Sequence, residues 1–313
     1  MTDTVAIIGA GLIGRAWAIV FARAGVQVRL HDIDPDGLDR ARRAIAVSLD
    51  DLRACDLVPE VKTVEARISY HSTLADALAG ATYAQECGPE KVDAKAKIFS
   101  AMEDAAAPGT ILASSTSGIV ASQFTNHLAR PEDCLVAHPV NPPSLVPLVE
   151  IAPSPSTGER AVETTMALMH QIGQTPILVR REIDGFILNR LQGALLTEAL
   201  RLYRDGYASA EDIDKAVRDG LGRRWAFMGP LETIDLNAPG GAGDYATRYG
   251  PIYAAADAER GESPWQDDVI GRLVAELRTM RPATKLPERQ EWRDRRLMAL
   301  TAHLSTARDE IGP

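Results

Sequence analysis

The first half of the chain alternates short apolar runs with longer helical segments. Residues 4–9 and 26–31 are apolar runs of strand length, and the alanine-rich stretch 12–24 between them has the length of a helix. Because strands that alternate with helices pair in parallel and are covered on both faces, the pattern predicts an α/β fold with a mostly parallel sheet. The same pattern predicts further strands at 67–70, 81–87, 110–115, 134–137, 148–151 and 176–179, and further helices after Pro35 and at 73–79, 90–107, 120–128 and 157–172.

The pattern changes after about Gly185. β-Branched runs disappear, and helical segments follow at 186–205, 210–219 and 287–308, with a glycine- and alanine-rich stretch at 237–243 that we expect to be a loop. At 313 residues the chain is longer than the roughly 250 residues at which single cores stop growing. We therefore predict an α/β sheet domain over residues 1–184 and an all-α C-terminal domain over residues 185–313.

Composition and charge argue against several classes of protein. Hydrophobic residues make up 45% of the chain and charged residues 25%, which is typical of a folded globular protein. The net charge of -9 repels a nucleic-acid backbone, and the three cysteines lack the CxxC spacing of a zinc site. The N-terminus has no basic, cleavable leader, and Pro108 and Gly109 interrupt the uncharged stretch 105–129. We expect a cytoplasmic protein with a small-molecule partner, no nucleic acid and no membrane span.

A glycine-rich motif joins the first predicted strand to the first predicted helix. Residues 9–14 read GAGLIG, a GxGxxG sequence in the strand-turn-helix setting that dinucleotide binding requires. Its glycines permit a tight turn and the approach of a pyrophosphate to the helix N-terminus. Asp32 ends the second predicted strand 18 residues after Gly14, where a carboxylate accepts ribose hydroxyls and repels a 2′-phosphate. The motif predicts a Rossmann-type domain that binds NAD in preference to NADP, through Gly9, Gly11, Leu12, Ile13, Gly14 and Asp32.

His138 is the strongest candidate for chemistry among the six histidines. It ends a predicted strand at the carboxyl edge of the sheet, where open α/β sheets place their ligands. Glu150 follows twelve residues later, after a proline-rich segment that can turn the chain back. A carboxylate beside an imidazole fixes its tautomer and stabilises the imidazolium, so the pair predicts a general base for a hydroxyl proton.

Other chemistries fit the sequence less well. The chain has no HExxH motif, paired histidines or cysteine cluster, so we expect no catalytic metal. Ser117 lies in STSG rather than GxSxG, which favours a hydrogen-bonding role over that of a hydrolase nucleophile. We interpret Cys87 as a small buried apolar residue.

Six segments together resemble a known family: GAGLIG, CGPEKVDAK at 87–95, SSTSG at 114–118, AHPVNPP at 137–143, PLVE at 147–150 and GFILNRL at 185–191. Through them, nearly the whole chain is similar to the NAD-dependent L-3-hydroxyacyl-CoA dehydrogenase superfamily. The resemblance implies that His138 is the base and Glu150 its partner. It further implies that the reacting oxygen is bound by Ser117 and Asn189, and the cofactor also by Glu90 and Lys95. It also implies a homodimer built through the helical domain.

Departures from the family pattern bear on the substrate. Acyl-CoA members have aromatic residues after the catalytic histidine, where this chain has Pro139 and Val140. The segments 137–143, 220–238 and 289–300 are instead similar to the branch of the superfamily that acts on free L-gulonate. Arg224, next to Arg223, is a candidate clamp for a substrate carboxylate, and a cation at a helix C-terminus is an equally good interpretation.

The expected activity is oxidation of the 3-hydroxyl of a small L-3-hydroxy acid, such as L-gulonate, to the 3-keto acid with NAD. Three alternatives stay open at this point. They are a short-chain 3-hydroxybutyryl-CoA dehydrogenase, a dehydrogenase of a carnitine-like substrate, and a catalytically idle NAD(H)-binding protein.

Overall fold

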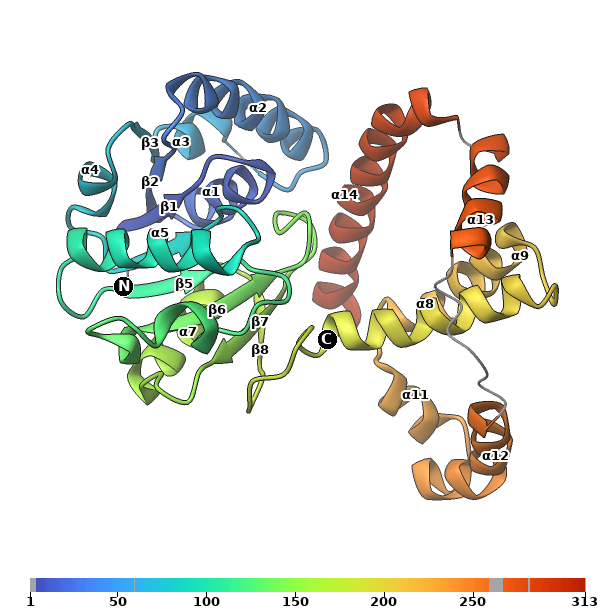
Figure 1. Cartoon of the computed structure of the whole chain (residues 1–313). Helices are drawn as coiled ribbons and strands as arrows, with labels where there is room; N and C mark the ends of the chain where they lie inside the picture. The colour runs from blue at the N-terminus through green and yellow to red at the C-terminus, as the bar shows by residue number, and fades with distance from the viewer. Residues whose placement is uncertain (1–3, 59, 259–266, 281, 313) are drawn as a thin grey trace. The chain divides into compact units, whose positions relative to one another are not determined.

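The computed structural model describes residues 4–58, 60–258, 267–280 and 282–312. Within these ranges, eight strands form one sheet in the order β3-β2-β1-β4-β5-β6-β7-β8 (Figure 1). The first six strands pair in parallel, β7 is antiparallel to β6, and β8 runs parallel to β7. The mostly parallel sheet predicted from the sequence is confirmed. The strands are β1 (Thr4–Ile8), β2 (Gln27–His31), β3 (Ile68–His71), β4 (Tyr83–Glu86), β5 (Ile111–Ser114), β6 (Cys134–Pro139), β7 (Leu148–Pro153) and β8 (Thr175–Leu178).

Alternating side chains on the strands explain why helices cover both faces of the sheet. Val5 and Ile7 of β1 belong to one apolar cluster, and Ala6 and Ile8 belong to a second, because successive residues of a strand face opposite sides. The first cluster includes residues of α1 (Leu12–Arg23), α2 (Pro35–Ala54), α3 (Val61–Glu65) and α7 (Glu159–Gln171). The second includes residues of α4 (Leu74–Leu78), α5 (Val92–Ala105) and α6 (Ser122–Thr125).

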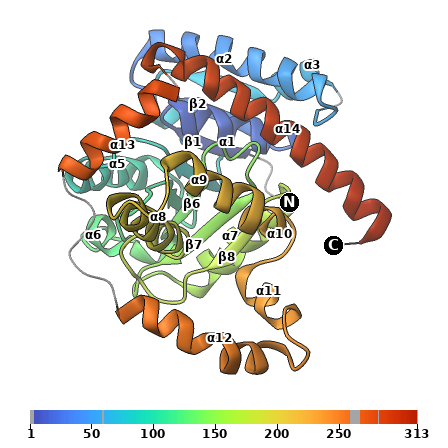
Figure 2. The same ribbon diagram turned by 90° about the vertical axis from the view of Figure 1, so that its right-hand side faces the viewer.

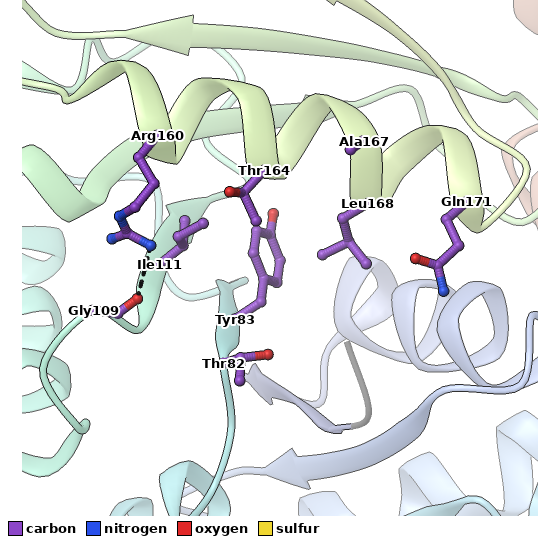
Figure 3. A pocket seen from close by; sticks show the side chains of 9 residues that line it. All are labelled: Thr82, Tyr83, Gly109, Ile111, Arg160, Thr164, Ala167, Leu168 and Gln171. Atoms are coloured by element: carbon purple, nitrogen blue, oxygen red, sulfur yellow. Dashed lines mark hydrogen bonds between the residues drawn. The ribbon is translucent and has the colours of Figure 1, made fainter. Parts of the chain in front are cut away.

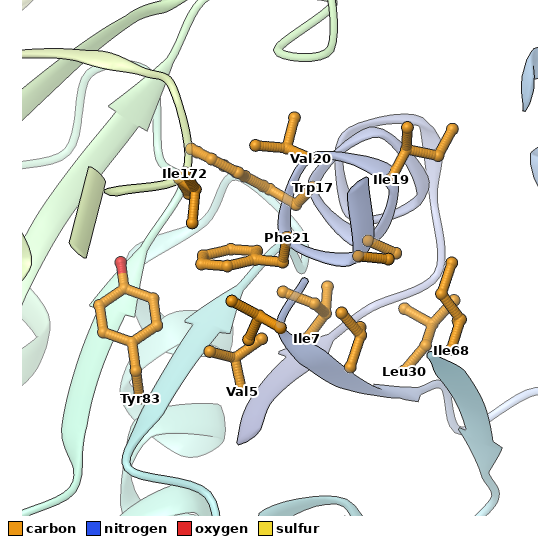
Figure 4. Packing of buried hydrophobic residues seen from close by; sticks show 14 of the residues in the cluster. Val5, Ile7, Trp17, Ile19, Val20, Phe21, Leu30, Ile68, Tyr83 and Ile172 are labelled. Carbon is orange, nitrogen blue, oxygen red and sulfur yellow. The ribbon is translucent and has the colours of Figure 1, made fainter. Parts of the chain in front are cut away.

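Aromatic side chains fill the centre of the first cluster (Figure 4). The ring of Phe21 lies 5.5 Å from that of Trp17 and 6.0 Å from that of Tyr83 between centroids. All three side chains are at most 1% exposed, so truncating one to alanine should cost about 3–5 kcal/mol. The Nε1–H of Trp17 donates to Ser115 Oγ at 3.2 Å, which ties this core to the loop after β5.

β6 and β7 form a hairpin whose turn lies at the carboxyl edge of the parallel strands. Because β7 is antiparallel to β6, its first residues return to the edge at which β6 ends. The register places His138 directly opposite Glu150. β7 continues to Pro153, two residues beyond its predicted end, so Glu150 lies inside the strand and not at its end.

The chain divides into two compact units, residues 1–190 with 288–313 and residues 191–287. The last helix, α14 (Leu286–Ile311), accounts for the second segment of the sheet unit. Met298 of α14 belongs to the apolar cluster around α1, and Thr301 Oγ1 donates to the carbonyl oxygen of Leu145 at 3.3 Å. This grouping differs from the expected domains 1–184 and 185–313, because an apolar helix face does not reveal which unit it contacts.

The second unit is helical throughout its described part (Figure 2). Few of its side chains are buried: Leu200, Ala210, Thr233 and Val269. Its elements are α8 (Leu188–Arg204), which starts in the first unit, α9 (Ala210–Lys215), the π-helical turn η2 (Ala216–Leu221), α10 (Gly222–Trp225), α11 (Pro230–Leu236), α12 (Gly241–Ala258), α13 (Asp267–Met280) and the 3-10 turn η3 (Ala283–Lys285).

Two further predicted elements differ clearly in extent from the observed ones. The segment 120–128 is helical only in α6, because the N–H groups of Gln123 and Phe124 bond to carbonyls three residues back in a tight turn. The loop expected at 237–243 ends early, and α12 already begins at Gly241. The side chain of Asp235 explains this start, since its Oδ1 accepts the N–H of Ala242 at 2.8 Å.

Candidate active site

The glycine-rich turn between β1 and α1 has the shape that a bound pyrophosphate requires. Gly9 has a φ of +107°, and its N–H donates to the carbonyl oxygen of His31 at 2.8 Å. A side chain at Gly14 would bring Cβ to 1.8 Å from the carbonyl oxygen of Gly9, so only glycine lets helix and turn meet here. A Cβ at Gly11 would meet no atom within 4 Å, and Gly11 is the N-cap of α1 without a side-chain cap. An anion in this space would receive N–H groups and the positive end of the helix dipole.

Asp32 follows β2 and braces the same turn. Its Oδ2 accepts the N–H of Ala10 at 2.8 Å, and its Oδ1 accepts the N–H of Asp34 at 3.0 Å. Each carboxylate oxygen has further acceptor capacity, which leaves room for ribose hydroxyls. Leu12, which is 57% exposed, and the half-buried Ile13 form the first turn of α1 beside it. The structure thus places the candidate cofactor residues of the glycine motif and Asp32 together.

His138 and Glu150 lie in contact across the β6–β7 hairpin. Nδ1 of His138 is 2.7 Å from Oε2 of Glu150, and the ring of Phe186 packs against the imidazole at 5.5 Å between centroids. Beside a carboxylate, Nδ1 carries the proton and Nε2 is left as an acceptor. In the part of the chain that the structure describes, no side chain or backbone group hydrogen-bonds to Nε2. His138 is 6% exposed, so the imidazole is largely buried.

Glu150 is fully buried and still favours its charged form. Its Oε1 accepts the N–H groups of Ile187 and Leu188 at 2.8 and 2.9 Å, at the N-terminus of α8. Burial raises the pKa of this carboxyl, but the hydrogen bonds from His138, Leu188 and Ile187 outweigh burial and hold the pKa below its usual value. Both oxygens are therefore fixed, and the imidazole is held by a permanent negative charge.

Ser117, Glu90 and Asn189 form a second cluster at the carboxyl edge. Oε1 of Glu90 accepts hydrogen bonds from Thr116 Oγ1 at 2.6 Å, Ser117 N at 2.9 Å and Ser117 Oγ at 3.1 Å. Burial raises the pKa of Glu90, and the bonds from Thr116 and Ser117 lower it further than burial raises it. Asn189 Nδ2 donates to the carbonyl oxygen of Ser117 at 2.5 Å. The first turn of α8 therefore contacts both clusters, through Leu188 and Asn189.

Lys95 lies inside the sheet unit and is 1% exposed. Its Nζ is 3.0 Å from Glu86 Oε2 and 3.5 Å from Glu90 Oε2. Sequence reasoning missed Glu86, although an acid at the end of an apolar strand is a signal that could have singled it out. It also missed Phe186 and the backbone donors of Ile187 and Leu188, and backbone N–H groups leave no signal in a sequence.

Family models match both parts of the chain. The NAD binding domain of 3-hydroxyacyl-CoA dehydrogenase matches residues 4–183, and the C-terminal domain of the same family matches residues 185–281. The chain belongs to the 3-hydroxyacyl-CoA dehydrogenase family. This is a family of NAD-dependent dehydrogenases that act on CH–OH groups, and NAD is the cofactor of this dehydrogenase. The open space at Gly11, the free helix N-terminus and Asp32 fit that cofactor.

Known relatives of the dehydrogenase span almost its whole length. Lambda-crystallin of Oryctolagus cuniculus is 40% identical over 302 residues, which cover 95% of the chain and 94% of that protein. The lambda-crystallin homolog of Homo sapiens is 39% identical over 306 residues, with 95% and 94% covered. An L-carnitine dehydrogenase of Streptomyces griseus is 38% identical over 262 residues, with 83% and 75% covered.

Solved structures share the fold of the dehydrogenase. An NAD+ dependent dismutase, 5-formyl-3-hydroxy-2-methylpyridine 4-carboxylic acid 5-dehydrogenase, has a TM-score of 0.84 at 28% identity, with 97% of this chain and 99% of that chain covered. A 3-hydroxybutyryl-CoA dehydrogenase of Escherichia coli has a TM-score of 0.67 at 30% identity, with 75% and 49% covered.

Two further residues, Arg224 and Cys87, were singled out in the sequence of the dehydrogenase. Arg224 belongs to the second unit, on α10, and is half-buried, so its role as a carboxylate clamp stays a prediction. Cys87 Sγ lies 3.3 Å from Ser115 Oγ, and burial raises the pKa of the thiol to about 12. The thiol therefore stays protonated at neutral pH. Cys87 is half-buried, and not fully buried as the sequence predicted.

A groove of about 430 Å³ lies at the other edge of the sheet (Figure 3). Thr82 and Gly109, which line it, precede β4 and β5, whereas the candidate site follows the carboxyl ends of the strands. Arg160 in this groove donates to the carbonyl oxygen of Gly109 and pairs with Asp133. The groove is therefore separate from the candidate active site.

Metal sites and membrane spans are both absent from the described ranges. There, no set of three or more His, Cys, Asp or Glu side chains is arranged to hold a metal ion. None of the described helices combines the length and the apolar character needed to cross a bilayer.

Proposed function

We propose that this dehydrogenase oxidises the 3-hydroxyl of a small, free L-3-hydroxy acid resembling L-gulonate to the 3-keto acid, with NAD as oxidant. The observation that carries the proposal is the contact of 2.7 Å between His138 Nδ1 and Glu150 Oε2. It leaves Nε2 of a nearly buried imidazole as an acceptor at the edge of the sheet where the cofactor turn lies.

His138 is the general base of the proposed reaction. Its Nε2 takes the proton of the substrate hydroxyl, and Glu150 keeps the proton on Nδ1 and stabilises the imidazolium that forms. NAD, when bound, supplies the acceptor for the hydride that leaves the same carbon. A positioned general base contributes about 10²- to 10⁴-fold to the rate.

Ser117 and Asn189 hold the reacting oxygen in this proposal. Asn189 uses one of its two amide protons on the carbonyl oxygen of Ser117, which leaves the second for the substrate. The bond from Ser117 Oγ to Glu90 is the longest of the three that Glu90 Oε1 accepts, at 3.1 Å. Of the three groups that donate to Glu90 Oε1, the hydroxyl of Ser117 is therefore the one that can most easily turn toward a substrate.

Two residues of the chain and the names of two similar proteins favour a free acid over a CoA thioester. Pro139 and Val140 stand where acyl-CoA members have aromatic residues. L-carnitine and the pyridine carboxylic acid of the dismutase, named for two similar proteins, are small molecules that carry a free carboxylate. We propose Arg224 as the group that binds the substrate carboxylate through paired N–H bonds.

L-Carnitine is a second candidate substrate, because two proteins named as L-carnitine dehydrogenases are each 38% identical to this chain. The retained polar residues His138, Glu150, Ser117 and Asn189 argue against an idle NAD(H)-binding protein, which would be free to lose them.

A direct competition tests the substrate class. NADH formation is measured with L-gulonate, 3-hydroxybutyrate, L-carnitine and 3-hydroxybutyryl-CoA, offered singly and in pairs. We expect a free acid to have the highest kcat/KM. A large preference for the CoA thioester would overturn the free-acid proposal, and silence with every substrate alongside tight NADH binding would support the idle protein.

We also propose a homodimer built through the helical unit. Phe227, Leu231, Leu236 and Ile252 are between 61% and 78% exposed, in a unit with few buried side chains. Helices of this kind normally bury an apolar face, and a second copy of the chain offers a matching one. A mass of one chain by light scattering would overturn the proposal. The cytoplasmic location stays a prediction.

A further inference from the structure

Glu86 and Lys95 form a fully buried ion pair beneath the candidate active site. Glu86 ends β4 and is 0% exposed, and Lys95 on α5 is 1% exposed. Oε1 of Glu86 accepts the N–H of Gly88 at 2.6 Å and Lys95 Nζ at 3.1 Å. Oε2 accepts Lys95 Nζ at 3.0 Å and Ser114 Oγ at 2.6 Å. Each oxygen of the carboxylate therefore has two donors.

Stability alone does not account for this pair. Removing two charges from water often costs more than their mutual attraction returns, and an apolar pair of the same volume is frequently at least as stable. Buried ion pairs are in some proteins retained because they fix one arrangement of the groups around them. The groups around Lys95 show which arrangement that is here.

Lys95 connects Glu86 to the cluster that holds Ser117. Its ammonium lies 3.5 Å from Glu90 Oε2, and the other oxygen of Glu90 accepts the backbone N–H and the hydroxyl of Ser117. Lys95 also lowers the pKa of Glu90, after burial and the hydrogen bonds from Thr116 and Ser117. A continuous series of contacts thus runs from Glu86 through Lys95 and Glu90 to the turn that carries Ser117.

We propose that Glu86 is a positioning residue for Ser117, acting through Lys95 and Glu90. This inference rests on the function proposed above. Glu86 holds the amino group of Lys95 in place beside Glu90. Glu90 then presents an ionised oxygen that sets the position of the Ser117 backbone and hydroxyl. Glu86 itself touches neither substrate nor cofactor.

The first test needs no activity. The amide ¹H–¹⁵N signal of Ser117 is recorded in the full-length labelled protein without substrate, in Glu86→Gln and in a control, Asp133→Asn. Asp133 is 8% exposed and pairs with Arg160 at the other edge of the sheet. We expect the Ser117 signal to move in Glu86→Gln and to stay in Asp133→Asn. An unmoved signal in Glu86→Gln, or equal shifts in both variants, overturns the proposal whether or not the protein oxidises a hydroxy acid.

The second test separates positioning from a general loss of structure. Glu86→Gln should lower kcat for the hydroxy acid about 10- to 100-fold, because displacing a reacting group by about 1 Å costs up to 10²-fold. The NADH dissociation constant is measured on the same samples, and a loss confined to NADH affinity would place the effect at the cofactor contacts Glu90 and Lys95 and overturn a role at Ser117. In a Ser117→Ala background the same substitution should cost less than about twofold, because coupled residues are not additive. An undiminished loss in that background overturns the proposal.

A second variant covers the case in which Glu86→Gln does not fold. The double replacement Glu86→Met with Lys95→Met removes both charges and keeps an apolar volume, which buried pairs often tolerate. We expect it to fold, with the Ser117 signal moved and kcat lowered. A folded double variant with a normal Ser117 signal and normal kcat overturns the proposal. A protein without activity on any acid refutes the proposed function instead, and the signal of Ser117 still decides the role of Glu86.

Discussion

Replacing Glu150 by glutamine tests the hydrogen bond to His138, because the structure fixes how the new side chain must lie. The N–H groups of Ile187 and Leu188, at 2.8 and 2.9 Å, require an oxygen and so select the carbonyl of the glutamine. Its NH2 group then faces Nδ1 of His138, and two donors cannot hydrogen-bond to each other. His138 must turn Nδ1 into an acceptor and carry its proton on Nε2. In this tautomer Nε2 cannot take the proton of a substrate.

The expected loss is the whole contribution of the general base. We expect kcat to fall about 10²- to 10⁴-fold, which corresponds to roughly 3–5 kcal/mol in the activation barrier. Steady-state NADH formation at saturating NAD and hydroxy acid measures it. NADH affinity, followed by fluorescence, should change by less than about twofold, because the substitution leaves the glycine-rich turn intact.

Glu103 offers a control for this substitution. Its Oε2 accepts the N–H of Ala129 at 3.0 Å and its Oε1 accepts the N–H of Arg130 at 2.7 Å, so Glu103→Gln also removes a hydrogen bond of a carboxylate. No histidine lies among its hydrogen-bond partners in the described structure. Glu103→Gln should therefore keep the kcat of the unaltered protein. A kcat within about threefold of normal in Glu150→Gln, or an equal loss in Glu103→Gln, would refute the tautomer argument.

Three further predictions follow from the structure. Gly14→Ala should abolish folding or NADH binding, because its Cβ would lie 1.8 Å from the carbonyl oxygen of Gly9. Gly11→Ala is the control, because its Cβ meets nothing within 4 Å, and it should keep the melting temperature and weaken only NADH binding. Asp32→Asn should raise NADPH affinity relative to NADH by about tenfold, roughly 1.4 kcal/mol, as the repulsion of a 2′-phosphate falls; an unchanged ratio in titrations would count against Asp32. Because the pKa of Glu150 is lowered in the folded state, its stabilising effect is present above the unfolded value of about 4.3 and lost as the pH falls through the folded value. Acid unfolding followed by circular dichroism should depend less steeply on pH below 4 in Glu150→Gln, and an unaltered profile would contradict this.

Sequence reasoning found those parts of the site whose signal is local. In the turn between strand and helix, Gly9 and Gly14 have a steric cause and Gly11 leaves space for a cofactor, so the motif predicts the turn directly. The contact between His138 and Glu150 followed from an acid placed after a proline-rich turn, although the antiparallel course of β7 was not expected. Pairing in a hairpin brings residues on the two sides of a turn face to face. The short separation of His138 and Glu150 in the sequence was therefore enough to predict their contact.

The rest of the site depends on contacts without a local signal. Glu86 and Lys95 are nine residues apart on a strand and a helix, a spacing that no helical or strand period relates. Lys95 was expected to reach the cofactor, and only the fold shows that its ammonium is enclosed by Glu86 and Glu90. The grouping of α14 with the sheet unit could not be predicted for the same reason. The apolar face of a helix shows that it packs against something, but the sequence does not indicate which element it contacts.

The role of His138 as the base is tested by the turnover of His138→Ala. NADH formation by the full-length variant is compared with that of the unaltered protein at saturating hydroxy acid and NAD, with NADH affinity measured on the same samples. We expect kcat to fall at least about 10²-fold while NADH affinity stays nearly intact. Near-normal turnover in the variant would contradict this role of His138.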